Sequence, residues 1–215
     1  MILFKISRTI RILLLRILIK FRNEKTLIYF RDDYGDYAIE RDLPIETVLT
    51  LGVGNNVEFE KWLLKSNPNI QFILVDPVIN VDLANTRKIE KLITREIDET
   101  CMYSRKRLDD NSFSYYIDEN GTYSGISLNQ CLQIDDNEIL LKFDIEGFEY
   151  IILEDLANLI RNHHINQIVC ELHWNWYNLK SIMNVYNFFK RLRREGLYPV
   201  WFSSLGKEFL ITKDT

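Results

Sequence analysis

TVLTLGVGNNVEFEKWLLKSNPNIQFILVDP, residues 47–77, is the segment that decides the fold of this chain. Its first apolar run ends at Gly52 and Gly54, a helical pattern follows over about 56–66, and a second apolar run ends in Asp76. Glycines let the backbone turn tightly and approach a ligand, and the start of a helix offers unpaired N–H groups. An acid at the end of the next strand can accept hydrogen bonds from both hydroxyls of a ribose. This order therefore predicts a βαβ unit that binds a nucleoside.

The acid makes this prediction more specific than the glycines do. The third glycine of the dinucleotide pattern G-x-G-x-x-G is missing, because Val57 stands at that position. A tight turn without a ligand would explain the glycines alone, and a turn before Pro77 would explain Asp76 alone. An acid about 20 residues after the glycines is, however, the expected partner of a ribose. Together the two features favour a cofactor site made by Gly52, Gly54, Asn55 and Asp76.

Composition places the chain among ordinary globular proteins. Of its 215 residues, 47% are hydrophobic and 27% are charged, and the net charge is −4. This composition suits one domain with short additions, and the overall charge gives no indication of nucleic-acid binding. The three cysteines, Cys101, Cys131 and Cys170, are widely spaced and form no C-x-x-C pair. We therefore expect neither a zinc cage nor a disulfide framework, and a reducing, cytoplasmic location.

The first 22 residues differ from the rest of the chain. They contain six basic residues and no acid, and apolar residues fall on one face of the predicted helix. The apolar runs between these charges are too short for a membrane-spanning helix or a signal peptide. Such a helix could lie on an anionic membrane surface, or it could pack on the core of the protein or on a partner subunit. We expect a basic amphipathic helix over 1–25 and one domain over 26–215, cytoplasmic or peripheral on a membrane.

Alternating strand and helix patterns predict the fold class. We expect strands near 26–31, 46–52, 70–76, 113–117, 123–126, 138–143, 167–172, 197–203 and 208–213, and helices near 56–66, 80–91, 150–161 and 179–195. The turn signal in 118–121 predicts a hairpin between the strands on either side of it. The loop between the last two strands is too short for a parallel crossover, so the last strand must run antiparallel. We therefore predict a three-layer, Rossmann-like α/β sheet, mostly parallel, with an antiparallel C-terminal hairpin. This arrangement is typical of class I S-adenosylmethionine-dependent methyltransferases.

A second motif carries three acids. The segment LLKFDIEGFE, residues 140–149, is an apolar strand that runs into Asp144, Glu146 and Glu149 around one glycine. Ligands of open parallel sheets bind at the carboxyl ends of the strands, where Asp144 and Glu146 stand. Glu149 is accounted for by a favourable position at the start of the following helix.

Three motifs together resemble one enzyme family. KFDIEGFE is similar to the K-(I/F)-D-(I/V)-E-G-x-E signature of FkbM-like methyltransferases, and LGVGNNVEFE resembles the glycine motif of a related branch of methyltransferase-like proteins. The sequence Glu171-Leu172-His173 is like the E-L-H that follows the next strand in that branch. The resemblance covers about residues 45–212. In many class I methyltransferases an acid precedes the first glycine by two residues. Here Thr50 stands at that position, and the related branch also lacks the acid.

The resemblance implies an S-adenosylmethionine-dependent O-methyltransferase that acts on a hydroxyl of a sugar, glycan or small metabolite. His173 could be the general base with Glu171 as its partner, and Asp144 or Glu146 could serve instead. Glu60 and Asp144 are both candidates to accept the ammonium group of the cofactor. A divalent metal bound by Asp144, Glu146, Glu171 and His173 is conceivable but not predicted.

Two other interpretations remain open from the sequence. A NAD-linked or nucleotide-sugar-linked oxidoreductase would share the glycine turn and Asp76, but the missing glycine, the terminal hairpin and the absence of a Tyr-x-x-x-Lys pair argue against it. A non-catalytic scaffold anchored to a membrane by residues 1–22 would not need the KFDIEG and ELH motifs.

Overall fold

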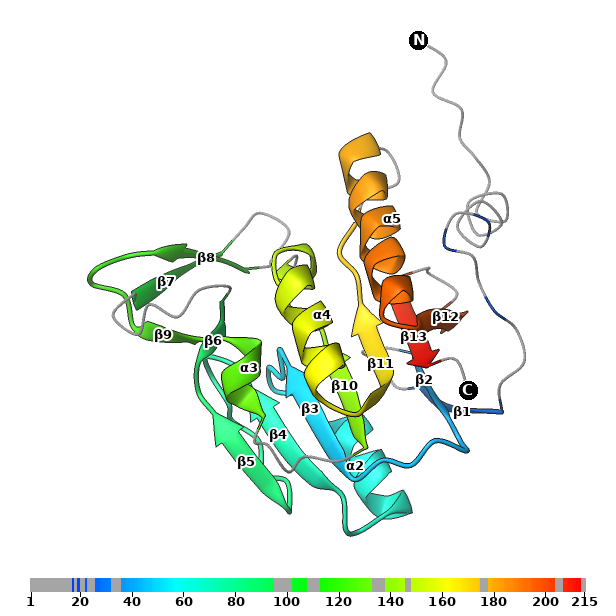
Figure 1. Ribbon diagram of the computed structural model, residues 1–215. Coiled ribbons are helices and arrows are strands. Elements are labelled where there is room, and N and C mark those ends of the chain that lie inside the picture. Colours follow the sequence, from blue (N-terminus) through cyan, green and yellow to red (C-terminus); the bar gives the residue numbers. More distant parts are fainter. Residues whose placement is uncertain are drawn as a thin grey trace.

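The computed structural model describes residues 17, 19, 22, 26–31, 36–94, 102–107, 113–132, 138–145, 148–174, 178–203 and 207–213. A seven-stranded sheet forms its centre, in the order β12-β13-β11-β10-β3-β4-β5 (Figure 1). The strands are β3 (Thr47–Leu51), β4 (Gln71–Val75), β5 (Thr86–Ile89), β10 (Ile139–Phe143), β11 (Ile165–Glu171), β12 (Leu197–Phe202) and β13 (Glu208–Lys213). The strands from β11 to β5 run parallel, and β13 runs antiparallel between β11 and β12. The predicted fold class is thereby confirmed.

The alternation of side chains along the central strands builds two separate cores. On β10, Leu141 and Phe143 pack under the helices α4 (Leu153–Asn162) and α5 (Leu179–Arg194). Leu140 belongs to the opposite core, which contains the buried face of α2 (Glu58–Ser66) and the hairpin of β1 (Leu27–Arg31) and β2 (Asp36–Glu40). Figure 1 shows α4 and α5 in front of the sheet and α2 behind it. The carboxyl ends of the parallel strands therefore lie between two well-packed layers.

One buried side chain fixes the β1–β2 hairpin to the sheet. The amide of Gln167, on β11, accepts a hydrogen bond from the backbone N–H of Glu40 at 2.7 Å and donates one to its carbonyl at 3.2 Å. Gln167 has no exposed surface, so both of its hydrogen-bonding groups need a partner inside the protein. The side chain thus acts on β2 as a neighbouring strand would.

The predicted helix over 80–91 is wrong. Residues 76–85 form no helix, and Thr86–Ile89 is the edge strand β5, paired with β4. Asn85 adopts a left-handed conformation with φ of 56°, which ends any helical path at that residue. Its side-chain amide donates hydrogen bonds to the carbonyls of Pro68 and Ile70, so the turn is held against the preceding loop.

The predicted hairpin between 113–117 and 123–126 is also wrong in its pairing. Both strands exist, but a third strand lies between them in a second sheet with the order β6-β9-β7-β8. Its strands are β6 (Leu92–Ile93), β7 (Met102–Arg107), β8 (Phe113–Ile117) and β9 (Tyr123–Ile126), and the short helix α3 (Leu128–Cys131) follows. The turn at Asp118 is held to β7 instead, because its carboxylate accepts a hydrogen bond from the Ser104 hydroxyl. The 3₁₀ turn η1 (Phe148–Tyr150) precedes α4.

The predicted N-terminal helix lies almost wholly outside the described residues. Within it, Ile19 is fully buried in the core under α5, and its carbonyl accepts a hydrogen bond from Arg193 at 2.8 Å. The backbone N–H of Arg22 donates to the Pro199 carbonyl at 3.0 Å. This end of the segment packs on the domain, as one of the two alternatives requires. Membrane contact through residues 1–22 and the boundary at residue 25 stay predictions.

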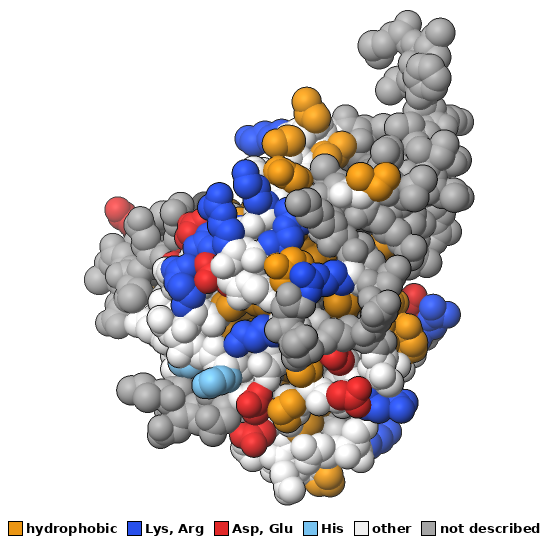
Figure 2. Space-filling model, turned by 45° about the vertical axis from the view of Figure 1, so that its right-hand side comes forward, with side chains coloured by type: hydrophobic (Ala, Val, Ile, Leu, Met, Phe, Trp, Pro, Cys, Tyr) orange, Lys and Arg blue, Asp and Glu red, His pale blue; other side chains and the backbone are white. Residues whose placement is uncertain are grey.

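The face that carries α5 is rich in basic side chains. Helix α5 has Lys180, Lys190 and Arg194 exposed, and Lys and Arg side chains gather on this side of the molecule in Figure 2. No helix among the described residues is both long and apolar enough to cross a membrane.

Ile19 and Ile17 offer a test of the packing alternative. We expect Ile19→Ala to lower the free energy of unfolding by about 2–4 kcal/mol, because it removes apolar atoms from a filled core. Ile17 is 68% exposed, so Ile17→Ala is the matched control, with a change of about 0.5 kcal/mol or less. Urea unfolding followed by tryptophan fluorescence measures both. Equal effects of the two variants would show that the segment does not contribute to the core.

Candidate active site

The two predicted motifs meet at the carboxyl edge of the central sheet. The backbone N–H of Asp144, just beyond β10, donates to the Leu51 carbonyl at 3.0 Å, and that of Gly52 donates to the Val75 carbonyl at 2.9 Å. A Cβ atom on Gly52 would lie 1.8 Å from the Asp144 carbonyl oxygen. Only glycine allows the chain to pass so close, and φ of 76° at Gly52 also favours it. The glycine turn and the acidic motif are therefore one structural unit.

Asp76 holds the glycine turn from the neighbouring strand. Its Oδ2 accepts a hydrogen bond from the Gly54 N–H at 3.1 Å, and its Oδ1 accepts one from the Val78 N–H at 2.8 Å. A carboxylate has about four acceptor positions, so Asp76 keeps acceptor capacity for ligand hydroxyls. Gly54 and Asn55 are exposed beside it, and Asp76 is partly exposed. Four of the residues predicted to bind the cofactor are thus brought together.

Glu60 lies beneath this surface and not on it. It is fully buried, and its Oε1 accepts hydrogen bonds from the Thr50 hydroxyl at 2.9 Å and the Lys142 ammonium at 3.0 Å. Lys142 is itself buried, 9% exposed at its side chain. The paired cation and the hydroxyl both bind Oε1 and offset the cost of burying the charge, whereas the buried Oε2 has no hydrogen-bond partner among the described residues. Glu60 therefore ties α2 to β3 and β10 under the glycine turn, and direct contact with a cofactor stays a prediction.

A histidine and a buried glutamate form the centre of the site. His173, two residues beyond β11, has its Nδ1 2.8 Å from Oε1 of Glu149, whose side chain is 0% exposed. The sequence assigned Glu149 only a favourable place near a helix start. Glu149 is the last acid of KFDIEGFE and lies in the 3₁₀ turn η1, which follows the strand β10. In this turn its side chain is buried and contacts His173. The sequence carried no local signal for this contact, because the two residues are 24 positions apart.

The pairing with Glu149 determines which nitrogen of His173 is available. A carboxylate can only accept, so Nδ1 carries the proton and Nε2 of the neutral ring is an acceptor. Nε2 lies 3.7 Å from Oδ1 of Asp144 and 3.9 Å from Oε1 of Glu171. Both distances exceed a hydrogen bond, and Nε2 faces these two carboxylates. His173 is 25% exposed at its side chain, enough for a ligand to reach it.

The backbone at His173 is fixed from both sides. The Tyr150 hydroxyl donates to the His173 carbonyl at 3.3 Å, and burial, with Glu149 next in importance, raises the pKa of Tyr150 above its ordinary value. Tyr150 therefore stays a neutral donor. On the other side, the Leu172 N–H donates to the Lys207 carbonyl at 2.9 Å, and the Lys207 ammonium lies 3.7 Å from Glu171.

One predicted site residue is not placed. Glu146 lies outside the described residues. Trp174, next to His173 in the sequence, is partly buried and packs against the core under α4 and α5. In the part of the chain that the structure describes, no group of three or more His, Cys, Asp or Glu side chains is arranged to hold a metal ion.

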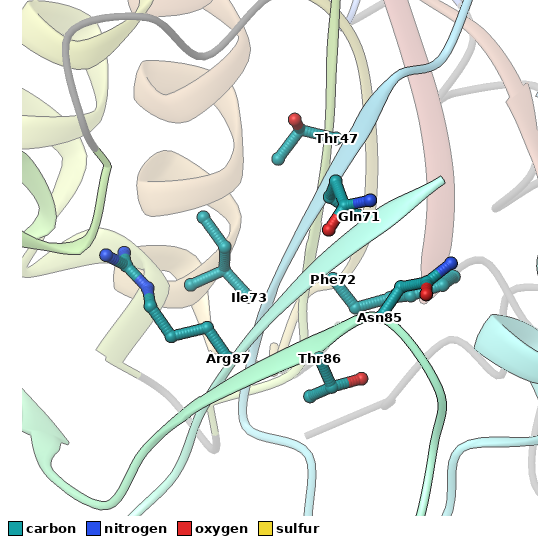
Figure 3. Close-up of a pocket in the computed structure, with 7 residues that line it drawn as sticks. All are labelled: Thr47, Gln71, Phe72, Ile73, Asn85, Thr86 and Arg87. Atoms are coloured by element: carbon teal, nitrogen blue, oxygen red, sulfur yellow. The ribbon is translucent and has the colours of Figure 1, made fainter. Parts of the chain in front are cut away.

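A cavity of about 430 Å³ lies at the other edge of the sheet. Figure 3 shows residues that line it, among them Thr47, Gln71 and Thr86, each the first residue of its strand. Ile73 and Arg87 face each other across β4 and β5 and point to the same side in this view. The cavity is separated from Asp144 and His173 by the length of the strands, so it has no part in the site described above.

Comparison with known proteins identifies the family. The model of the methyltransferase FkbM domain matches residues 19–198. A search of curated proteins found no match to this chain. Because the matched region is most of the chain, this protein belongs to the FkbM methyltransferase family. The suspected membership of the FkbM-like methyltransferase family is thereby confirmed.

The close approach of Gly52 to Asp144 leads to a matched pair of variants. Both Gly52 and Gly54 have positive φ, so alanine costs about 1–2 kcal/mol of backbone strain at either position. Nothing lies within 4 Å of a Cβ on Gly54, whereas Gly52→Ala meets the Asp144 carbonyl. We expect Gly52→Ala to lower the free energy of unfolding by about 1–3 kcal/mol more than Gly54→Ala does. Thermal and urea unfolding measure the difference, and equal losses would contradict the proposed contact.

Proposed function

We propose that this methyltransferase uses S-adenosylmethionine to methylate a hydroxyl group of a sugar, a glycan or a small polyhydroxylated metabolite. The observation that carries the proposal is the Glu149–His173 pair, which stands beside Asp144 at the edge where the glycine turn also ends. A hydroxyl must lose its proton when its oxygen is methylated, and an imidazole held in one tautomer suits that task. The family supplies methyl transfer; the donor and the acceptor are the proposed part.

The residues at the glycine turn fit S-adenosylmethionine. Asp76 retains acceptor positions for the two ribose hydroxyls, and the space beside Gly54 is open, since a Cβ there would meet nothing within 4 Å. The backbone of Asp144 packs against Gly52 and its side chain is 34% exposed, so Asp144 is a better candidate for the ammonium group than the buried Glu60. Glu60 would act from below by holding the turn. The bound cofactor would supply an electrophilic methyl group.

The residues around His173 would handle the acceptor. Nε2 would take the proton of the acceptor hydroxyl, and Glu149 would stabilise the imidazolium that results. Glu171, 16% exposed at its side chain, can accept a hydrogen bond from a second hydroxyl of the same molecule. Acceptors with neighbouring hydroxyls would thus be oriented by Glu171 and deprotonated by His173.

The alternatives considered from the sequence receive less support. The final strand is antiparallel between β11 and β12, and the family is a methyltransferase family, so an oxidoreductase is not favoured. A scaffold without catalysis would not need a buried glutamate that orients a histidine at the ligand-binding edge.

Cofactor binding is the first test. We expect S-adenosylmethionine and S-adenosylhomocysteine to bind and NAD not to bind, as measured by calorimetry. Asp76→Ala should weaken binding by roughly 1.5–3 kcal/mol, since hydrogen bonds to a charged group are lost. Asp82→Ala, an exposed acid in the same loop, is the control and should bind as the wild type does. If neither nucleoside binds, or if the two variants bind alike, the assignment of the cofactor site is wrong.

The Glu149–His173 pair is tested by a double-mutant cycle. We expect His173→Ala to lower kcat by about 10²–10⁴-fold with cofactor affinity nearly intact. Glu149→Gln should lower kcat on its own but add little in the His173→Ala background, because the two residues act as one unit. Glu154→Gln, which changes an exposed acid paired with Arg191, is the control and should leave kcat unchanged. Independent, multiplicative losses would show that Glu149 does not act through His173.

A further inference from the structure

Helix α5 differs in charge from the chain as a whole. Residues 179–194 contain five basic residues and no acid, although the net charge of the chain is −4. The buried residues of α5 are Val185, Phe188, Phe189 and Leu192. The exposed residues are Leu179, Lys180, Met183, Asn187, Lys190 and Arg194. Their spacings of three and four residues place them on one side of the helix, opposite to the buried residues. We call these six residues the α5 stripe.

The positive charges of the α5 stripe are directed to solvent. Its basic side chains form no ion pair within the part of the chain that the structure describes, and they belong to Lys180, Lys190 and Arg194. The flanking Arg191, by contrast, is paired with Glu154 at 3.1 Å. On α2, behind the sheet, the exposed Lys61 is paired with Glu58 at 2.7 Å. The stripe is therefore a basic surface without the acids that accompany these other basic residues.

The amino-terminal half of the α5 stripe also carries apolar side chains. Leu179 is 74% exposed and Met183 is 45% exposed, one helical turn apart. Phe188 packs on Phe143, the last residue of β10, with ring centroids 6.1 Å apart. Leu179 lies about 13.5 Å from Phe188 along the helix, since each residue adds about 1.5 Å. Figure 1 shows the first turns of α5 beyond the ends of β10 and β11. The apolar pair therefore projects from the molecule.

The end of the basic N-terminal segment lies beside this helix. The buried Ile19 has its carbonyl bonded to Arg193 of α5 at 2.8 Å. Ile17, only two residues away, is 68% exposed, which adds another apolar side chain close to α5. Hydrophobic and basic side chains thus share this side of the molecule, as Figure 2 shows.

We propose that the α5 stripe is a docking surface for an anionic lipid bilayer. Each Lys or Arg near such a surface contributes about 1 kcal/mol, or about fivefold in affinity. Leu179 and Met183 would enter the boundary between the headgroups and the acyl chains. A nucleic acid would attract the same charges, but it offers no apolar phase for these two side chains. The membrane contact expected for residues 1–22 is thereby assigned to a different element, and no residue of the stripe belongs to the candidate active site.

Sedimentation of the full chain with lipid vesicles tests the proposal. The probes are vesicles of phosphatidylcholine with about 30% phosphatidylserine, and vesicles of phosphatidylcholine alone. We expect the protein to sediment with the anionic vesicles and much less with the neutral ones. Binding should weaken as the salt concentration rises from about 0.1 to about 0.5 M, because salt screens exposed charges. A wild-type protein that does not bind the anionic vesicles would refute the proposal.

Two double variants with the same change of charge locate the surface. Lys180→Gln with Lys190→Gln should weaken binding to the anionic vesicles about 25-fold, which is about fivefold for each residue. Lys61→Gln with Lys65→Gln removes the same charge from α2, behind the sheet, and should change the affinity less than about twofold. Equal losses in the two double variants would show that only the overall charge matters, and α5 would not be the docking surface.

The apolar pair distinguishes a bilayer from a soluble acidic partner. Leu179→Ser with Met183→Ser leaves every charge in place and should weaken vesicle binding at least about tenfold, because two apolar side chains no longer leave water. Both residues are exposed, so the midpoint of thermal unfolding should stay the same. Unchanged vesicle binding in this variant would show that the charges act alone, and a bilayer would not be the partner that the stripe fits.

Variants of the N-terminal segment give the last control. Arg8→Gln with Arg11→Gln also removes two positive charges. If this pair abolishes vesicle binding and both α5 pairs leave it unchanged, the membrane contact lies in residues 1–22 and the assignment to α5 is wrong. Binding of S-adenosylhomocysteine, measured in parallel, should be the same in all of these variants, since none of them alters the candidate active site.

Discussion

The arrangement of the site depends on one close contact, between the backbone of Gly52 and the carbonyl of Asp144. Parallel strands β3 and β10 are neighbours, so the residues that follow them compete for the same space at the edge of the sheet. A side chain at position 52 would push the two segments apart, since its first carbon would lie 1.8 Å from the Asp144 oxygen. The absence of that carbon allows the glycine turn and the acidic motif to lie in direct contact. Asp76, bonded to the glycine turn, and His173, beside Asp144, are positioned by these two segments.

Buried charge supports the contact from below. Glu60 and Lys142 are both withdrawn from water, and removing either partner of such a pair costs about 3–5 kcal/mol. The pair joins α2 to β10, and the Thr50 hydroxyl joins it to β3. Many class I methyltransferases place an acid where Thr50 stands. In this chain a carboxylate comes from Glu60 on α2 and accepts a hydrogen bond from the Thr50 hydroxyl. A negative charge is therefore retained just below the glycine turn.

The sequence predicted the parts of this structure that depend on local pattern. The apolar runs ending at Gly52, Asp76, Asp144 and Glu171 became four adjacent parallel strands, because strand length and period leave few alternatives.

Prediction from the sequence failed where the pairing of strands is decided by contacts between distant segments. The segment 113–117 was expected to pair with 123–126, but β7 lies between them, and nothing in the turn at 118–121 indicates a third strand. Residues 80–91 failed for a local reason, the left-handed Asn85. Glu149 was assigned to a helix start, since a hydrogen bond across 24 residues to His173 has no local signature.

The charges of the site also favour the proposed role of His173 as the base. Asp144, Glu149 and Glu171 surround Nε2 and Nδ1, and among the described cations Lys207 reaches Glu171 at 3.7 Å. Such a site favours a positively charged ligand. In the proposed reaction it loses the charge of a sulfonium and gains that of a protonated His173, so the number of positive charges that face the carboxylates is the same before and after transfer. A carboxylate base would be neutralised by the same proton, and the site would then hold one positive charge and one negative charge fewer. With His173 as the base, Glu149 gains an ion pair at the moment that the cofactor loses its charge, and this gain favours the forward step.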